Sequence, residues 1–255
     1  MSMQNTANET NIVVDHVSKG FSQSDGSALG VLDDISFETD HEDFVCILGP
    51  SGCGKSTLLN LIADLDDPTN GQIHIGDSST ASNVSFVFQD PRLLEWRTVR
   101  SNLEYALRGK GIPKDEWESR IEHYLSLVDL ADFVDEYPRS LSGGMQQRVA
   151  LARALAVESD VILMDEPFGS LDEITARELR NDLVDIWERE QTTVIFVTHN
   201  AVEAAFLAQR ILVLSQRPAT IVADRTIDFD HPRSLDDPAV VGIAEDCVER
   251  LHEHI

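Results

Sequence analysis

The chain has few cysteines and no long apolar run, and each shortage excludes a class of protein. Three cysteines occur among 255 residues, at positions 46, 53 and 247, without the spacing of metal ligands. A disulfide framework is therefore excluded, and the cysteines are expected to be structural residues in a reducing compartment. The longest apolar runs, at 44–49 and 192–198, are too short to cross a bilayer and have the composition of buried strands.

Basic residues are also scarce. The chain has 20 Lys and Arg residues against 45 Asp and Glu residues, which gives a formal net charge of -25. Such a surface repels nucleic acid and anionic lipid, so we expect no nucleic-acid partner. The hydrophobic content of 42% is sufficient for a folded core. Because molar salt shortens the screening length to roughly 3 Å, we expect a protein of a salt-rich cytoplasm, as in halophilic microbes.

The first half of the chain combines short strands with one helix. Residues 1–11 are polar and lack a secretory pattern, so we expect a flexible tail there. Antiparallel strands are predicted over 12–21 and 30–38, before the buried run at 44–49. Leucine and isoleucine at helical spacing predict a helix over 54–65. Two more strands are expected within 68–77 and 83–90.

A helical insert and an alternating segment follow. Residues 98–156 have helical periodicity and no convincing strand, and a helix is expected to open at Pro113. From 160 to 215, strands alternate with helices, which indicates a mainly parallel sheet covered on both faces. A terminal helix is expected within 232–255.

The segment GPSGCGKST, residues 49–57, is a P-loop pattern between an apolar strand and a helix. Its glycines, Gly49, Gly52 and Gly54, allow several backbone N–H groups to point at phosphate oxygens, and the helix adds positive charge at its start. Lys55 is expected to contact the β- and γ-phosphates, Ser56 to bind Mg²⁺ and Thr57 to reach the α-phosphate. The remaining loop residues are Pro50, Ser51 and Cys53. An ordinary glycine-rich turn is the alternative interpretation, and Cys53 is expected to fill the turn rather than to sense redox state.

Two carboxylates end the apolar run at 161–167. Mg²⁺ requires hard oxygen ligands, which suits Asp165, and Glu166 is then available as the general base that polarises an attacking water. Considered without the P-loop, Asp165 and Glu166 would be interpreted as two solvated acids in a turn at the end of a strand. Together with a P-loop, it indicates nucleotide hydrolysis.

Six segments in this order resemble the motifs of the ATP-binding cassette (ABC) family. They are GPSGCGKST at 49–57, FVFQD at 86–90, LSGGMQQR at 141–148, VILMDEP at 161–167, SLD at 170–172 and VTHN at 197–200. The resemblance implies an α/β P-loop NTPase fold with a mainly parallel core sheet, an antiparallel β subdomain and a helical subdomain at about 91–156. It implies an ATPase domain over 12–230 and a helical extension over 231–255.

The resemblance also implies roles for individual residues. Gln89 would sense Mg²⁺ and the attacking water, His199 would contact the γ-phosphate, and Phe21 would stack on adenine. The chain would form a head-to-tail homodimer, in which Ser142, Gly143, Gly144 and Asp172 complete the ATP site of the opposite subunit. The chain departs from the family pattern at Met145, where glutamine is commoner, and at Asn200, where aspartate is frequent.

Residues 90–107 resemble the corresponding segment of importers of nitrate, sulfonates and taurine, with Glu95 in place of the usual proline. This similarity implies the motor subunit of an importer at the cytoplasmic face of the membrane, bound to a permease and served by an extracytoplasmic solute-binding protein. Trp96 would be an anchor for the permease or, alternatively, a core residue. A non-transport ABC ATPase, for example a cluster-assembly or regulatory factor, is the second hypothesis.

Overall fold

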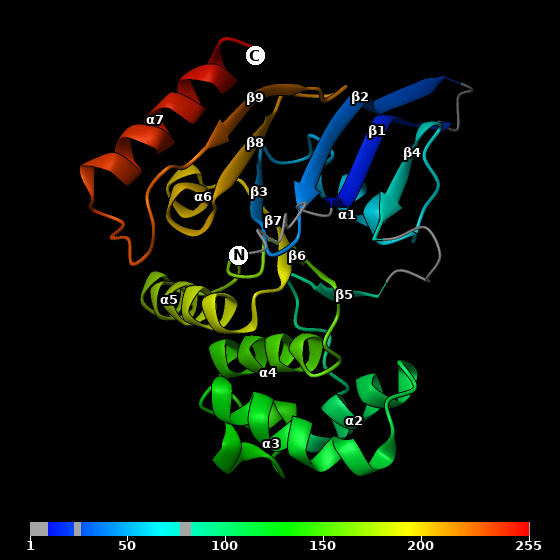
Figure 1. Cartoon of the computed structure of the whole chain (residues 1–255), viewed down its shortest axis with the longest axis vertical. Coiled ribbons are helices and arrows are strands. Elements are labelled where there is room, and N and C mark those ends of the chain that lie inside the picture. The colour runs from blue at the N-terminus through cyan, green and yellow to red at the C-terminus, as the bar shows by residue number, and fades with distance from the viewer. Residues whose placement is uncertain (1–9, 23–26, 77–82, 255) are drawn as a thin grey trace, which may run out of the picture. The chain divides into compact units, whose positions relative to one another are not determined.

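The computed structural model of the chain describes residues 10–22, 27–76 and 83–254 (Figure 1). These residues divide into two compact units. The first unit takes the described residues up to 76 and those from 192 onward, and the second takes 83–191. Of the tail expected over 1–11, residues 1–9 lie outside the described residues, and the first strand begins at Thr10.

The first unit contains an antiparallel sheet of three strands, in the order β2-β1-β4. The strands are β1 (Thr10–Ser22), β2 (Ala28–Asp40) and β4 (Asn70–Ile75). Val14 of β1 lies opposite Phe37 of β2, and both side chains are buried. Alternation along each strand thus gives the sheet one apolar face. The predicted antiparallel strands are confirmed.

The other strands of this unit are ordered β7-β3-β8-β9. They are β3 (Phe44–Leu48), β7 (Thr193–Thr198), β8 (Arg210–Leu214) and β9 (Ile221–Thr226). β3 runs parallel to β7 and β8, and every residue of β3 and β7 is buried, as the apolar runs predict. β9 pairs antiparallel with β8 and is an edge strand that the sequence patterns missed.

Three helices belong to the first unit: α1 (Lys55–Ile62), α6 (Ala201–Leu207) and α7 (Pro238–His252). α1 follows β3 directly after the P-loop. α7, the predicted terminal helix, packs against α6 and along β8 and β9 (Figure 1).

The second unit joins a parallel strand pair to four α-helices. The pair is β5 (Val84–Val87) and β6 (Val161–Asp165). The helices are α2 (Val99–Gly109), α3 (Trp117–Leu127), α4 (Gly143–Leu155) and α5 (Glu173–Glu190). Between 98 and 156 the structure has only helices and turns, including short 3₁₀ turns at 131–133 and 138–140. The helix expected to open at Pro113 begins as a 3₁₀ turn over Lys114–Glu116, and α3 starts at Trp117.

Burial decides two questions that composition left open. All three cysteines are free and buried, which agrees with their expected structural role. Trp96 has 73% of its surface exposed, so its interpretation as a core residue is wrong. Among the described residues, no helix has the length and apolar content needed to cross a membrane.

Candidate functional site

The loop between β3 and α1 is the centre of the predicted phosphate site. Lys55 is only 4% exposed, and its ammonium group donates to the carbonyl oxygens of Gly49 at 2.9 Å and Pro50 at 3.1 Å. These two hydrogen bonds therefore hold the charged end of Lys55 against the backbone of the loop. Ser51, Gly52 and Ser56 are exposed beside it, where a phosphate chain can reach them.

The start of α1 is suited to an anion. α1 has no side-chain cap, whereas Ser142, Asp172 and Asn200 cap the starts of α4, α5 and α6. The first N–H groups of a helix without a cap need an acceptor, and the helix dipole favours a negative one. Gly54 precedes the helix with φ 126°, and a Cβ atom there would lie 2.8 Å from Cγ1 of Val31. Only glycine fits at this position, so the loop geometry depends on it.

Cys53 lies inside the loop with 2% of its surface exposed. Burial raises the pKa of its thiol, and the nearby charge of Lys55 opposes that rise. A protonated, buried thiol is a poor nucleophile. This agrees with the interpretation of Cys53 as a residue that fills the turn.

Arg217 is a second cation at this loop, and the sequence motifs missed it. A Cβ atom placed on Gly52 would lie 3.6 Å from Nη2 of Arg217, and the charge of Arg217 also opposes the rise that burial causes in the pKa of Cys53. Arg217 follows β8, the strand beside β3, so the sheet brings it to the loop across more than half of the chain. Because this contact depends on the pairing of β3 with β8, no local sequence pattern marks Arg217.

Phe21 lies near the end of β1 with 42% of its surface exposed. The ammonium group of Lys19 is 5.0 Å from the ring centroid and also donates to Asp66 at 2.6 Å. The exposed ring area leaves room for a planar partner. Stacking on adenine stays a prediction.

His199 follows β7 and is exposed. Asn200, next to it, caps α6 by accepting hydrogen bonds from the backbone N–H groups of Val202 at 3.0 Å and Glu203 at 3.2 Å. An aspartate would make the same cap, so the departure at Asn200 preserves the start of this helix. The cap fixes the turn from which His199 projects.

In the second unit, Asp165 is the last residue of β6 and Glu166 follows it. Glu166 has φ 44°, a left-handed conformation that costs a non-glycine residue roughly 1–2 kcal/mol. The backbone therefore turns sharply between the two carboxylates. Gln89 packs beside this turn, since a Cβ atom on Gly169 would lie 3.2 Å from its Nε2 and 3.4 Å from the Glu166 carbonyl oxygen.

The LSGG segment forms the start of α4. Ser142 caps the helix, and its Oγ accepts from the Met145 N–H at 3.3 Å. A Cβ atom on Gly144 would lie 2.4 Å from Cγ2 of Thr175, whereas one on Gly143 would lie 3.6 Å from Leu171. The starts of α4 and α5 therefore touch at Gly144.

Asp172 caps α5 at the same place. Its carboxylate accepts from the N–H of Thr175 at 3.1 Å and from the Thr175 hydroxyl at 2.8 Å. These two hydrogen bonds lower the pKa of Asp172 and keep it ionised. Thr175 thus links Asp172 to Gly144.

The predicted residues gather in three clusters. In the first unit, the P-loop residues contact one another and Arg217, while Phe21 and His199 have surroundings of their own. In the second unit, Gln89 lies beside the turn after Glu166, and Ser142, Gly144 and Asp172 lie at the paired starts of α4 and α5. Each cluster has the donors or acceptors that nucleotide chemistry requires.

The family profile described as "ABC transporter" matches residues 32–169. The chain therefore belongs to the ABC transporter family, and it is an ABC-type ATPase. The predicted fold, with its mainly parallel sheet, antiparallel β subdomain and helical subdomain, is confirmed.

Particular relatives are importer subunits. The chain is 46% identical to the nitrate import ATP-binding protein of Synechocystis, over 78% of this chain and 76% of that protein. It is 41% identical to an aliphatic sulfonates import ATP-binding protein of Bacillus cereus, over 94% of this chain and 95% of that protein. A solved dimeric, post-hydrolysis ATP-binding cassette bound to ADP and Pi matches with a TM-score of 0.74 and 30% identity, covering 86% of this chain and 100% of that one.

Proposed function

We propose that this chain is the ATP-hydrolysing motor subunit of an importer, driving uptake of a small anion such as nitrate, a sulfonate or taurine through a separate permease. The single observation that carries the proposal is the P-loop before the uncapped start of α1, in a chain 46% identical to a nitrate importer subunit. An extracytoplasmic solute-binding protein would deliver the solute. The chain would work at the cytoplasmic face of the membrane, held there by the permease.

The P-loop would hold the phosphates of ATP. Backbone N–H groups of residues 49–57 and the charges of Lys55 and Arg217 would neutralise the phosphate oxygens. Phe21 would stack on the adenine, and Thr57 would contact the α-phosphate. Because Lys55 is already fixed by Gly49 and Pro50, the loop binds nucleotide with little loss of side-chain freedom.

Hydrolysis needs a base and hard oxygen ligands. Ser56, Asp165 and Gln89 have the oxygen ligands that Mg²⁺ prefers, and bound Mg²⁺ would offset charge on the β- and γ-phosphates. Glu166 would accept a proton from the attacking water, and Gln89 would orient that water. His199 would contact the γ-phosphate.

Two copies would act together, head to tail. Ser142 and the N–H groups of Gly143 and Gly144 would bind the γ-phosphate held by the opposite subunit, with Asp172 at the same interface. The solved cassette bound to ADP and Pi is dimeric, which supports the pairing of two copies. Contacts to the γ-phosphate are lost after hydrolysis, which is the differential binding that a ligand-driven switch requires.

The exposed Trp96 would contact the permease. Its ring is 73% exposed, and Tyr105, 58% exposed, belongs to the same unit. A large aromatic side chain at the surface is a common anchor of protein interfaces. Burial against a partner would remove this apolar area from water.

The acidic surface suits a salt-rich cytoplasm. The net charge of -25 produces mutual repulsion that molar salt screens. We propose that the protein is adapted to such a cytoplasm.

Co-purification tests the proposal. The tagged chain, expressed together with the neighbouring genes of its own genome and extracted in mild detergent, should retain a membrane protein through purification. Vesicles containing that complex should take up labelled nitrate, sulfonate or taurine only with ATP and the binding protein. A chain that hydrolyses ATP but retains no membrane protein would favour the non-transport hypothesis.

A further inference from the structure

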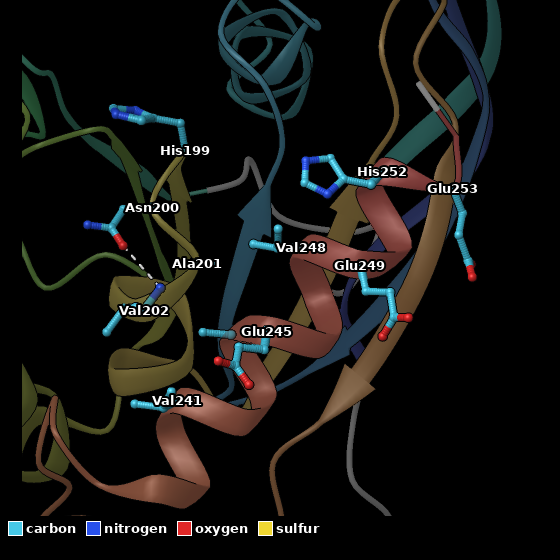
Figure 2. A pocket seen from close by; sticks show the side chains of 11 residues that line it. His199, Asn200, Ala201, Val202, Val241, Glu245, Val248, Glu249, His252 and Glu253 are labelled. Atoms are coloured by element: carbon cyan, nitrogen blue, oxygen red, sulfur yellow. Dashed lines mark hydrogen bonds between the residues drawn. The ribbon is translucent and has the colours of Figure 1, made fainter.

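A closed set of three hydrogen bonds links the end of β7 to the start of α6. The Thr198 hydroxyl donates to Oε2 of Glu203 at 2.5 Å and accepts from the Asn200 N–H at 3.0 Å. The Glu203 N–H completes the set by donating to Oδ1 of Asn200 at 3.2 Å. Figure 2 shows His199 and Asn200 on this turn, with the hydrogen bond from the Val202 N–H to Asn200 as a dashed line. His199 lies between two members of the set, Thr198 and Asn200.

This arrangement differs from the usual cap of a helix. In a capping box, the side chain of the third helical residue accepts directly from the N–H of the N-cap residue. Asn200 is the N-cap residue of α6 and Glu203 is the third helical residue, yet the Asn200 N–H donates to Thr198 instead. The Thr198 hydroxyl therefore stands between the two groups. Because Thr198 is the last residue of β7, this hydroxyl ties the helix start to the strand end, which a direct cap would not do.

Thr198 and Glu203 are buried, whereas His199 is exposed. Thr198 is 2% exposed and Glu203 is 7% exposed. Burial raises the pKa of the Cys46 thiol on β3, and the nearby charge of Glu203 raises it further, so Glu203 lies on the side of α6 that faces β3. The Thr198 hydroxyl gives its one hydrogen to Glu203. Any effect of this pair on ATP hydrolysis therefore passes through the turn.

The two neighbours of His199 are both restrained. Thr198 lies opposite Leu48 of β3 in the parallel sheet, and Asn200 is held through its N–H group and through its side chain. The backbone of His199 is thus held relative to β3, the strand that leads into the P-loop. A misplacement of about 1 Å in a group that acts on the reacting atoms can cost about 10²-fold in rate.

We propose that Thr198 and Glu203 are positioning residues for ATP hydrolysis, because their buried hydrogen bond holds His199 where its imidazole group reaches the γ-phosphate. The proposal rests on the proposed function, which places His199 at that phosphate. It adds that the imidazole group acts from a turn whose two ends are tied together by a side chain of β7 and a side chain of α6. Loss of the hydrogen bond leaves the P-loop unchanged, so it affects the rate of hydrolysis and not the binding of ATP.

Substitutions of the two partners test the proposal in the purified full chain. Thr198→Val removes the hydroxyl and keeps the branched shape, so it should lower kcat for ATP hydrolysis about tenfold and leave the dissociation constant of a fluorescent ATP analogue unchanged. Thr198→Ser keeps the hydroxyl and should retain most of the parental kcat. Glu203→Ala should act like Thr198→Val, whereas Glu203→Gln keeps an acceptor for the hydroxyl and should retain most of kcat.

Thr193→Val is the matched control. Thr193 is the first residue of β7, is 1% exposed, and its hydroxyl accepts from the Glu42 N–H at 2.9 Å, at the opposite end of the strand from His199. This variant should lower the unfolding temperature as Thr198→Val does and should keep the parental kcat. An equal fall of kcat in the two valine variants would show a general loss of stability and would overturn the proposal.

A double-mutant cycle separates positioning from a direct effect on hydrolysis. If the hydroxyl acts only by placing the imidazole group, Thr198→Val should cause no further fall in rate when it is added to His199→Ala. Single-turnover hydrolysis of radiolabelled ATP measures these low rates. An equal fall in both backgrounds would overturn the positioning role and leave the proposed function standing. A parental rate in His199→Ala would remove His199 from the γ-phosphate, and that part of the proposed function would fail together with this proposal.

Discussion

Gly144 faces the Cγ2 methyl group of Thr175 across the starts of two helices, without space for a side chain between them. A Cβ atom on Gly144 would lie 2.4 Å from that methyl group, well inside van der Waals contact. Thr175 cannot turn away without cost, because its hydroxyl donates to Asp172 at 2.8 Å. The relative placement of α4 and α5 therefore depends on the absence of one methyl group.

We expect Gly144→Ala to destabilise the protein by about 1–3 kcal/mol through overpacking and to lower ATP turnover. Gly143→Ala is the matched control, because its Cβ would meet Leu171 at an ordinary 3.6 Å. Thr175→Ser removes Cγ2 and keeps the hydroxyl, so it should restore the stability that Gly144→Ala loses. Urea unfolding of Gly144→Ala, Thr175→Ser and the double variant with both changes measures the energetic coupling between the two positions. Independent, additive effects would contradict the contact.

Arg217→Ala should weaken ATP binding about tenfold, because a charge-assisted contact to phosphate is lost. Arg217→Lys should keep much of the affinity, and the exposed neighbour Gln216→Ala is the control. Titration with a fluorescent ATP analogue gives the dissociation constants. If Arg217→Ala binds the ATP analogue with parental affinity, Arg217 does not contribute to the phosphate site.

Glu166→Gln should lower the rate of ATP hydrolysis by about 10²-fold or more, because the proposed general base is lost. ATP binding and ATP-driven dimerisation should remain, since the P-loop and the LSGG segment are unchanged. The rate of phosphate release measures ATP hydrolysis, and light scattering measures the fraction of protein that forms dimers. Glu178→Gln, an exposed change on α5, should hydrolyse ATP normally. Parental turnover in Glu166→Gln would refute the assignment of the base.

His16 makes stability depend on pH. Its Nδ1 lies 2.6 Å from Oδ1 of Asp34, and this hydrogen bond raises the pKa of His16 from 6.5 in the folded state. The stabilisation is complete below the unfolded pKa and is lost as the pH rises through the higher folded pKa. The difference in free energy of unfolding between the parent and His16→Asn should therefore shrink as the pH rises above 6.5.

Asparagine is chosen because residue 16 has φ 51°, a conformation that asparagine tolerates. Replacement of another exposed histidine, His41→Asn, controls for the loss of an imidazole group. A difference between parent and His16→Asn that stays constant over this pH range would show that the pair with Asp34 contributes no proton linkage.

The free energy of unfolding should rise between about 0.1 M and about 2 M KCl, because screening relieves repulsion among the carboxylates. The variant with Glu122→Lys and Glu178→Lys changes the net charge from -25 by four charges and should gain less from salt. Sucrose at matched osmolality controls for solvent exclusion. Equal stability at both salt concentrations would count against adaptation to a salt-rich cytoplasm.

The sequence predicted elements whose signal is local. The run at 44–49 became β3 because all of its side chains are buried between layers, and the P-loop glycines mark the turn that follows. Features that depend on distant partners were missed. β9 is half exposed and has no strict alternation, and its pairing with β8 defines it as a strand. Arg217 reaches the P-loop only because β8 lies beside β3.

Local sequence patterns likewise did not predict which side chains are exposed to solvent. The spacing around Trp96 suits a core residue and an interface anchor equally, and only the packing of the second unit exposes the ring. Pro113 marked the correct place for a helix, but the first turn after it is 3₁₀ and lacks a side-chain cap. Terminal turns depend on backbone hydrogen bonding that composition does not specify.

Ser142 can keep its present partner while it takes on another. A hydroxyl group has two acceptor lone pairs and one donor hydrogen, and the hydrogen bond from the Met145 N–H uses only an acceptor. In the proposed dimer, this hydrogen would be donated to a phosphate oxygen held by the opposite subunit, and α4 would keep its cap. Repeated opening and closing of that dimer would then require no refolding of this helix end, so local helix formation would not limit the rate of ATP turnover.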